Sequence, residues 1–201
     1  GRPRLSRREA PAAPAPPAQR VDAACAAVDA GHARFARVLT QRLAGVQAVH
    51  SAWAAGDTAG LAAAVEASRD EALAAGVFRQ LQQHSEPLSP RTLARLLPLA
   101  QRVSQTDCED HAVAAMRFVL HALRLSWPAV AKALRSVATP KAMWEACEEA
   151  TARLSSLLSV VKAMSRSVRV SRTSGPLVPV CRKLKTSLEE ALAAAGRGRT
   201  G

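Results

Sequence analysis

Apolar residues recur at three- and four-residue steps through most of the chain, and this spacing predicts a succession of helices. The first and longest is expected over residues 19–55, with Gly31 weakening or dividing it. Its apolar stripe consists of Phe35, Leu39, Leu43, Val46, His50 and Trp53. Such a stripe can pack on the core or receive the helices of a partner, and Trp53 is interpreted as a structural residue. Gly56 should end the helix, and Asp57 is placed to cap the next one.

Cap residues and prolines divide the rest of the chain into further helices. The expected starts, in chain order, are Ser68 with Glu71, Ser89 with Pro90, Asp107, Ser126 with Trp127 and Pro128, and Thr139 with Pro140. Pro98 is expected to kink the helix that contains it. The helix that begins at Thr139 should continue to about residue 169. A basic loop over residues 171–179 then leads to a last helix with Leu184, Leu188 and Leu192.

These elements predict an all-α fold: an antiparallel bundle of seven to eight helices, or a short solenoid-like stack. Composition supports this prediction, because alanine occupies 44 positions and tyrosine none, which favours helices and provides little for strands. We expect residues 1–18 to be a disordered Arg/Ala/Pro linker, residues 19–195 a helical interaction domain, and residues 196–201 a disordered tail. Apolar runs stay shorter than the roughly 18–20 residues of a membrane helix, so we expect no membrane association.

Candidate chemistry is sparse in the sequence. The motifs of phosphate-binding loops, dinucleotide folds, serine hydrolases and zinc proteases are missing, so we expect no catalytic residue, no cofactor and no metal. The four cysteines lie far apart and are interpreted as reduced, buried residues of an intracellular protein. His50 is interpreted as structural, and the polar run from Cys108 to His111 as a helix N-terminus rather than a metal or nucleophile site. Glu145, Glu148 and Glu149 are interpreted as a solvated face.

The charge is strongly positive and unevenly distributed. The formal net charge is +12, and residues 150–188 contain eight basic residues and no acidic one. Such a one-signed field attracts polyanions, although basic runs also occur as plain solvated faces. The candidate binding residues are Lys162, Arg166, Arg169, Arg172, Arg182, Lys183 and Lys185. The first three arginines of this set are three residues apart and would form a row where the chain is helical.

Several residues together resemble a known family. Arg42 and Trp53 precede Gly56-Asp57, and a leucine-rich helix later runs into Leu97-Pro98. With the apolar helices that follow, this pattern resembles the C-terminal domain of the WD40-bearing regulatory subunit of katanin, over residues 38–192.

The resemblance implies a non-catalytic regulatory domain. Its partners would be the N-terminal helical domain of the catalytic AAA ATPase subunit, tubulin in microtubules, and microtubule minus-end or spindle-pole proteins. It implies a place in the cytoplasm and cytoskeleton, at centrosomes, spindle poles or ciliary axonemes, with the severing chemistry belonging to the partner. Two alternatives stay open: a basic helical nucleic-acid-binding module, for which we find no reading motif, and an enzyme of unrecognised type.

Overall fold

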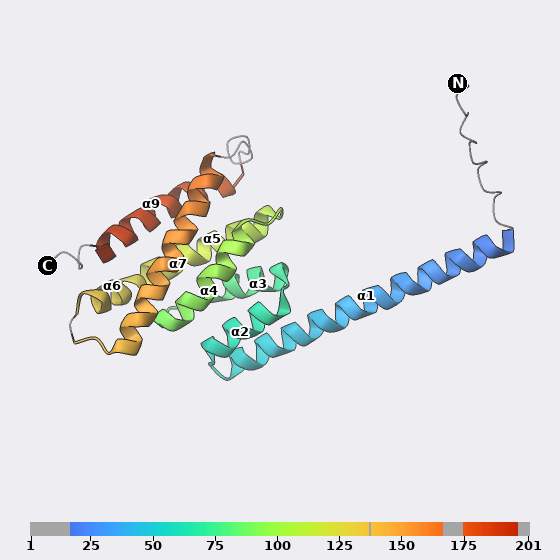
Figure 1. Ribbon diagram of the computed structural model, residues 1–201, viewed down its shortest axis with the longest axis horizontal. Helices are drawn as coiled ribbons and strands as arrows, with labels where there is room; N and C mark the ends of the chain where they lie inside the picture. Colours follow the sequence, from blue (N-terminus) through green and yellow to red (C-terminus); the bar gives the residue numbers. More distant parts are fainter. Residues whose placement is uncertain (1–16, 137, 167–174, 197–201) are drawn as a thin grey trace, which may run out of the picture. The chain divides into compact units, whose positions relative to one another are not determined.

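The computed structural model describes residues 17–136, 138–166 and 175–196 (Figure 1). Within this part of the chain it contains eight α-helices and no strand. The helices are α1 (Pro17–Ala54), α2 (Thr58–Ser68), α3 (Glu71–Leu81), α4 (Pro90–Ser104), α5 (Glu109–Leu125), α6 (Trp127–Arg135), α7 (Lys141–Arg166) and α9 (Leu177–Gly196). The predicted all-α fold is confirmed.

The chain divides into two compact units, residues 1–41 and residues 42–201. The described residues of the first unit all belong to α1, which continues without interruption through Gly31. Of the two expected effects of Gly31, division of the helix is therefore ruled out, and weakening stays a prediction. The cost of this glycine in a helix is only about 1 kcal/mol relative to alanine, and the many alanines around it offset that cost.

The second unit is a helical bundle in which helices pack against neighbours in sequence and against helices far apart in the chain. α4 packs against α5 and α7, α5 against α3 and α9, and α7 against α9. Figure 1 shows that α4 and α5 run in opposite directions, as do α7 and α9. The predicted antiparallel arrangement is thus present in these pairs.

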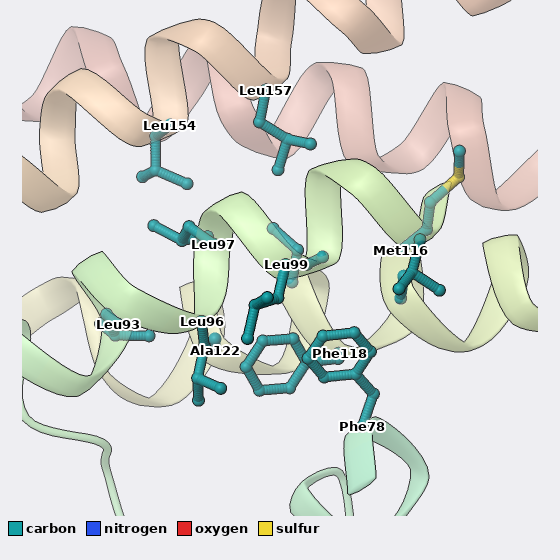
Figure 2. Packing of buried hydrophobic residues seen from close by; sticks show 14 of the residues in the cluster. Phe78, Leu93, Leu96, Leu97, Leu99, Met116, Phe118, Ala122, Leu154 and Leu157 are labelled. Carbon is teal, nitrogen blue, oxygen red and sulfur yellow. The ribbon is translucent and has the colours of Figure 1, made fainter. Parts of the chain in front are cut away.

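The core of the bundle lies between α4, α5 and the helices on either side of them. Figure 2 shows Leu154 and Leu157 of α7 directed toward Leu97 of α4. On another side, the rings of Phe78 and Phe118 are stacked with their centroids 4.7 Å apart. Both rings are fully buried, so they join α3 to α5 by dispersion and by removal of apolar area from water.

Helix starts follow the expected chemistry at some positions and depart from it at others. Ser89 caps α4 through a 3.1 Å bond from the Thr92 N–H, with Pro90 in the first turn, as predicted. The predicted capping box was wrong, because Asp70 caps α3. Its carboxylate accepts two backbone N–H bonds, whereas the Ser68 hydroxyl donates to the Val65 carbonyl of the preceding helix.

Two further starts were placed incorrectly. Cys108, not Asp107, occupies the cap position of α5 and makes no side-chain cap bond. The last helix begins at Leu177, so the predicted loop over 171–179 was too long. Pro179 lies in the first turn of α9, where a helix does not need the N–H that proline lacks.

Candidate functional site

Large apolar side chains on α1 are exposed to solvent. We call this set the α1 apolar face: Val21, Val28, Phe35, Val38, Leu39, Leu43, Val46 and Trp53. Phe35 is 64% exposed and Leu43 58%, and every described side chain from 21 to 41 is exposed. The stripe expected from the sequence is therefore exposed in the structure. Near the end of the helix, Val49 and Ala52 pack against the core instead.

Trp53 sits at the margin of the bundle. It is 37% exposed, and its ring meets that of His84 edge to face, with centroids 4.9 Å apart. Trp53 is therefore not a core residue. Gly56 follows in the left-handed conformation, with φ of 65°, which a residue with a Cβ adopts at a cost.

Asp57 caps α2, because its carboxylate accepts the N–H groups of Ala59 at 3.1 Å and Gly60 at 2.8 Å. Together Trp53, Gly56 and Asp57 end one helix and begin the next, and all three line a hollow of about 370 Å³. Trp53, Gly56 and Asp57 belong to the motif on which the family resemblance depends, and the turn that they form explains their structural role.

The other motif residues also hold helices together. The Arg42 guanidinium lies 2.7 Å from the carboxylate of Asp70, the residue that caps α3. This pair links the end of α1 to the start of α3. Leu97 is buried against α7, and Pro98 is half-buried inside α4, which continues through it.

The candidate basic residues fall on α7 and α9. Arg166 is exposed at the end of α7, while Arg182 and Lys183 are exposed on α9 and Lys185 is half-buried. We call these four residues and Lys162 the basic surface. Arg169 and Arg172 lie outside the described residues, so the predicted row of three arginines stays a prediction.

One member of the basic surface is engaged within the chain. The Lys162 ammonium lies 3.1 Å from the Glu189 carboxylate, which joins α7 to α9. Arg166 donates from its Nε to the Lys162 carbonyl at 3.2 Å. Within the described part of the chain, no carboxylate lies within ion-pair distance of Arg182 or Lys183. These two side chains therefore present uncompensated charge.

The polar run at the start of α5 has a role that the sequence did not reveal. The Glu109 carboxylate accepts the N–H of Leu177 at 3.2 Å, so it satisfies a free donor at the start of α9. The partners are 68 positions apart, and no local spacing rule relates them. The described residues contain no group of three or more His, Cys, Asp or Glu side chains able to hold a metal ion.

The cysteines are not all buried, contrary to the prediction. Cys147 and Cys181 are buried, and burial raises the pKa of both thiols, with Lys185 opposing the rise at Cys181. Cys25 and Cys108 are exposed. His50 is exposed as well, so it is not a satisfied core histidine.

These features define a class: a helical domain whose surface offers an apolar helix face and a group of cations. The sequence model of the con80 domain of katanin matches residues 30–188, most of the chain. The chain therefore belongs to the katanin con80 family, which confirms the resemblance. No curated protein matches the chain.

Membership indicates a regulatory role associated with katanin, partnership with its catalytic subunit, and a connection to the cytoskeleton. None of the described helices is long and apolar enough to cross a membrane.

Proposed function

We propose that this chain is a non-catalytic regulatory and targeting domain that binds the N-terminal helical domain of the katanin AAA ATPase subunit and the acidic tails of tubulin. In this proposal the α1 apolar face receives the ATPase subunit and the basic surface meets the tubulin tails. Severing takes place where this domain brings the ATPase to the microtubule, at centrosomes, spindle poles or axonemes.

The observation that carries the proposal is the exposure of the α1 apolar face. Eleven large apolar side chains are exposed in the described residues, and eight of them lie on this one helix. Soluble proteins rarely leave such a continuous apolar surface in water without a partner to cover it. Family membership supplies the partner, the catalytic subunit.

The spacing of the face favours a helical partner. Val21, Val28 and Phe35 are seven residues apart. A seven-residue repeat keeps apolar side chains on one side of a helix over several turns, and this is the seam that a second helix packs against. An amphipathic helix of the ATPase domain could therefore bind along α1 by side-chain interdigitation.

The test is calorimetric titration of the chain with the N-terminal domain of the katanin ATPase. The double variant Phe35→Asp/Leu43→Asp places two charges in the seam and should weaken binding by a hundredfold or more, about 3 kcal/mol. The matched control is Ala33→Asp/Ala44→Asp, which adds the same charges at exposed positions on the other side of α1.

Circular dichroism should show equal helicity for both double variants. Equal weakening by the control would mean that charge, not the apolar face, controls binding. Failure of the unmodified chain to bind at micromolar concentration would overturn this part of the proposal.

The basic surface is tested separately on microtubules. Arg182→Glu/Lys183→Glu should weaken co-sedimentation with microtubules, because both side chains are exposed and lack a partner among the described carboxylates. Proteolytic removal of the tubulin tails should likewise weaken the binding of the unmodified chain to microtubules. Added salt should also weaken this binding, because it screens the attraction between the basic surface and the acidic tails.

Arg91→Glu/Arg95→Glu on α4 is the matched control, since it makes the same change in net charge at two other exposed arginines. Equal weakening by this control would show that only net charge matters. Equal or tighter retention on duplex DNA at physiological salt would assign the basic surface to nucleic acid and overturn the tubulin part.

A further inference from the structure

A hollow of about 750 Å³ lies where α6, α7 and α9 meet. These three helices pack against one another. We call this hollow the acidic groove. It shares none of its lining residues with the α1 apolar face or the basic surface.

The floor of the groove is apolar and partly exposed. Trp144 of α7 is 37% exposed, and Leu134 of α6 and Leu192 of α9 are half-buried. An indole beside two aliphatic side chains forms a recess in which a partner's apolar side chain loses contact with water. The volume lies within the range of sites that hold ligands, roughly 300–1,000 Å³.

The side of the groove is acidic. Glu145, Glu148 and Glu149 contribute to its lining, and no lysine or arginine does so. Glu145 lies 3.8 Å from Lys141, and Glu149 lies 3.3 Å from Arg153. Both pairs are exposed neighbours along the same helix, and such pairs contribute less than about 1 kcal/mol each. A partner's cation can therefore replace either intramolecular one at little cost.

This acidity stands out because the chain as a whole carries a formal charge of +12. A net positive charge repels basic ligands at long range, so a basic segment needs a local group of carboxylates to bind. In the groove, by contrast, three carboxylates lie beside an apolar floor. The three glutamates do not form a group that could hold a metal ion, so a divalent cation does not account for them.

We propose that the acidic groove is a docking site for a basic peptide segment of another protein, one that carries an apolar anchor side chain. The anchor packs on Trp144 between Leu134 and Leu192, and lysine or arginine side chains on either side of it pair with the glutamates. The site has the opposite charge preference from the basic surface, so the two surfaces select different partners.

Fluorescence anisotropy with a labelled peptide of Lys and Leu at helical spacing, about 14 residues or four turns long, tests the proposal. The full chain should bind it, and a peptide with Glu in place of Lys should not. A peptide with Ser in place of Leu should bind at least tenfold more weakly, because it lacks the anchor.

Variants of the chain locate the site. Trp144→Ala should weaken binding by about tenfold or more, the effect of removing a central aromatic contact. The matched control is Trp53→Ala, which removes a tryptophan of the same 37% exposure outside the groove. Glu145→Gln/Glu148→Gln/Glu149→Gln should weaken binding and reduce its salt dependence, whereas Glu190→Gln, on an exposed glutamate outside the groove, should not.

Several results would overturn the proposal. They are no binding by the unmodified chain, equal binding by Trp144→Ala, or equal binding of the Glu-containing peptide. Peptide affinity that rises sharply in a chain ending at Gly196 would assign the groove to the chain's own basic tail instead. Dimerisation that Trp144→Ala abolishes, without peptide binding, would assign it to a second copy.

The proposal is independent of the proposed function. Trp144→Ala should leave binding of the ATPase domain and of microtubules unchanged, because its side chain lies on neither of those surfaces. A loss of those activities in this variant would show that the groove belongs to them and would overturn its assignment to a separate partner.

Discussion

α1 and α7 are the two longest helices of the described chain, with 38 and 26 residues, and both carry apolar residues on one side. On α7, Leu154, Leu157 and Val161 are at most 1% exposed. On α1, Phe35 and Leu43 are more than half exposed. The two patterns look alike in the sequence, but α7 packs against α4, α6 and α9, whereas the described side chains from 21 to 41 of α1 have no cover.

The difference shows what an amphipathic pattern specifies. Apolar spacing requires that something cover one side of a helix, and it does not say whether the cover comes from the same chain or from another protein. In the bundle, neighbouring helices provide the cover. For α1 we propose that the ATPase subunit provides it, so the following predictions compare the two regions.

Truncation of one leucine in each region should give the largest difference between the regions in the free energy of unfolding. Leu154→Ala should lower the free energy of unfolding by about 2–5 kcal/mol, because it leaves a cavity in a closely packed core. Leu39→Ala, at 48% exposure, should change it by less than about 0.5 kcal/mol. Urea unfolding followed by tryptophan fluorescence, to which the buried Trp127 contributes, measures both.

An equal loss in the two variants would break the comparison, because it would mean that α1 is covered in the free chain. Sedimentation over a range of concentrations would then show whether a second copy provides the cover. With the ATPase domain bound, Leu39→Ala should become costly, since its side chain would then be part of an interface.

The bundle was largely predictable because its signals are local. Ser89-Pro90, Asp57 and the leucines of the last helix each act within a few residues, and the structure has them as expected. The sequence-based prediction was wrong where two neighbouring residues could both cap the same helix. Asp70 and Ser68 are both good caps, and the choice of Asp70 depends on the turn in which Arg69 adopts a φ of 52°.

Long-range pairings could not be predicted from one sequence. The Glu109 bond to Leu177, the Lys162–Glu189 pair and the bond from the Trp127 indole to the Ala191 carbonyl each join residues far apart in the chain. For the candidate site, charge located the basic run. The α1 apolar face carried the right residues, but the sequence could not distinguish an interface from a core.

Thiol reactivity compares the regions at single residues. Cys25 of α1 is exposed and should react with an iodoacetamide probe at the rate of a free thiol, whereas Cys181 of the bundle is buried. If Cys181 reacts only through opening of the bundle, it should react about a thousandfold more slowly, as an opening free energy near 4 kcal/mol requires. Mass spectrometry of peptides after timed labelling measures each site.

Cys108 is the control, because it belongs to the bundle unit and is exposed, so it should react as fast as Cys25. Alkaline pH should erode the protection. Burial raises the pKa of Cys147 and Cys181, so as the pH rises through the ordinary pKa of a thiol the unfolded chain releases these protons first and the bundle loses stability. Protection that increased with pH would contradict the assigned burial.

Alanine substitution of two glycines should give the smallest effects on stability, and the two effects should have opposite signs. A Cβ at Gly31 or at Gly56 would meet nothing within 4 Å, so packing does not enter. Gly31 lies inside the exposed part of α1, and Gly31→Ala should increase the helicity of α1 and stabilise it by about 0.5–1 kcal/mol. Gly56 has a φ of 65°, and Gly56→Ala should cost about 1 kcal/mol through backbone strain alone.

Circular dichroism at 222 nm measures the first change, and the urea midpoint of the bundle measures the second. A gain from Gly56→Ala would mean that the turn after Trp53 is not left-handed. No gain in helicity from Gly31→Ala would mean that α1 already has tertiary support along its described length, because intrinsic propensity matters most where nothing else holds the helix. That result would remove the exposed face on which the proposed function depends.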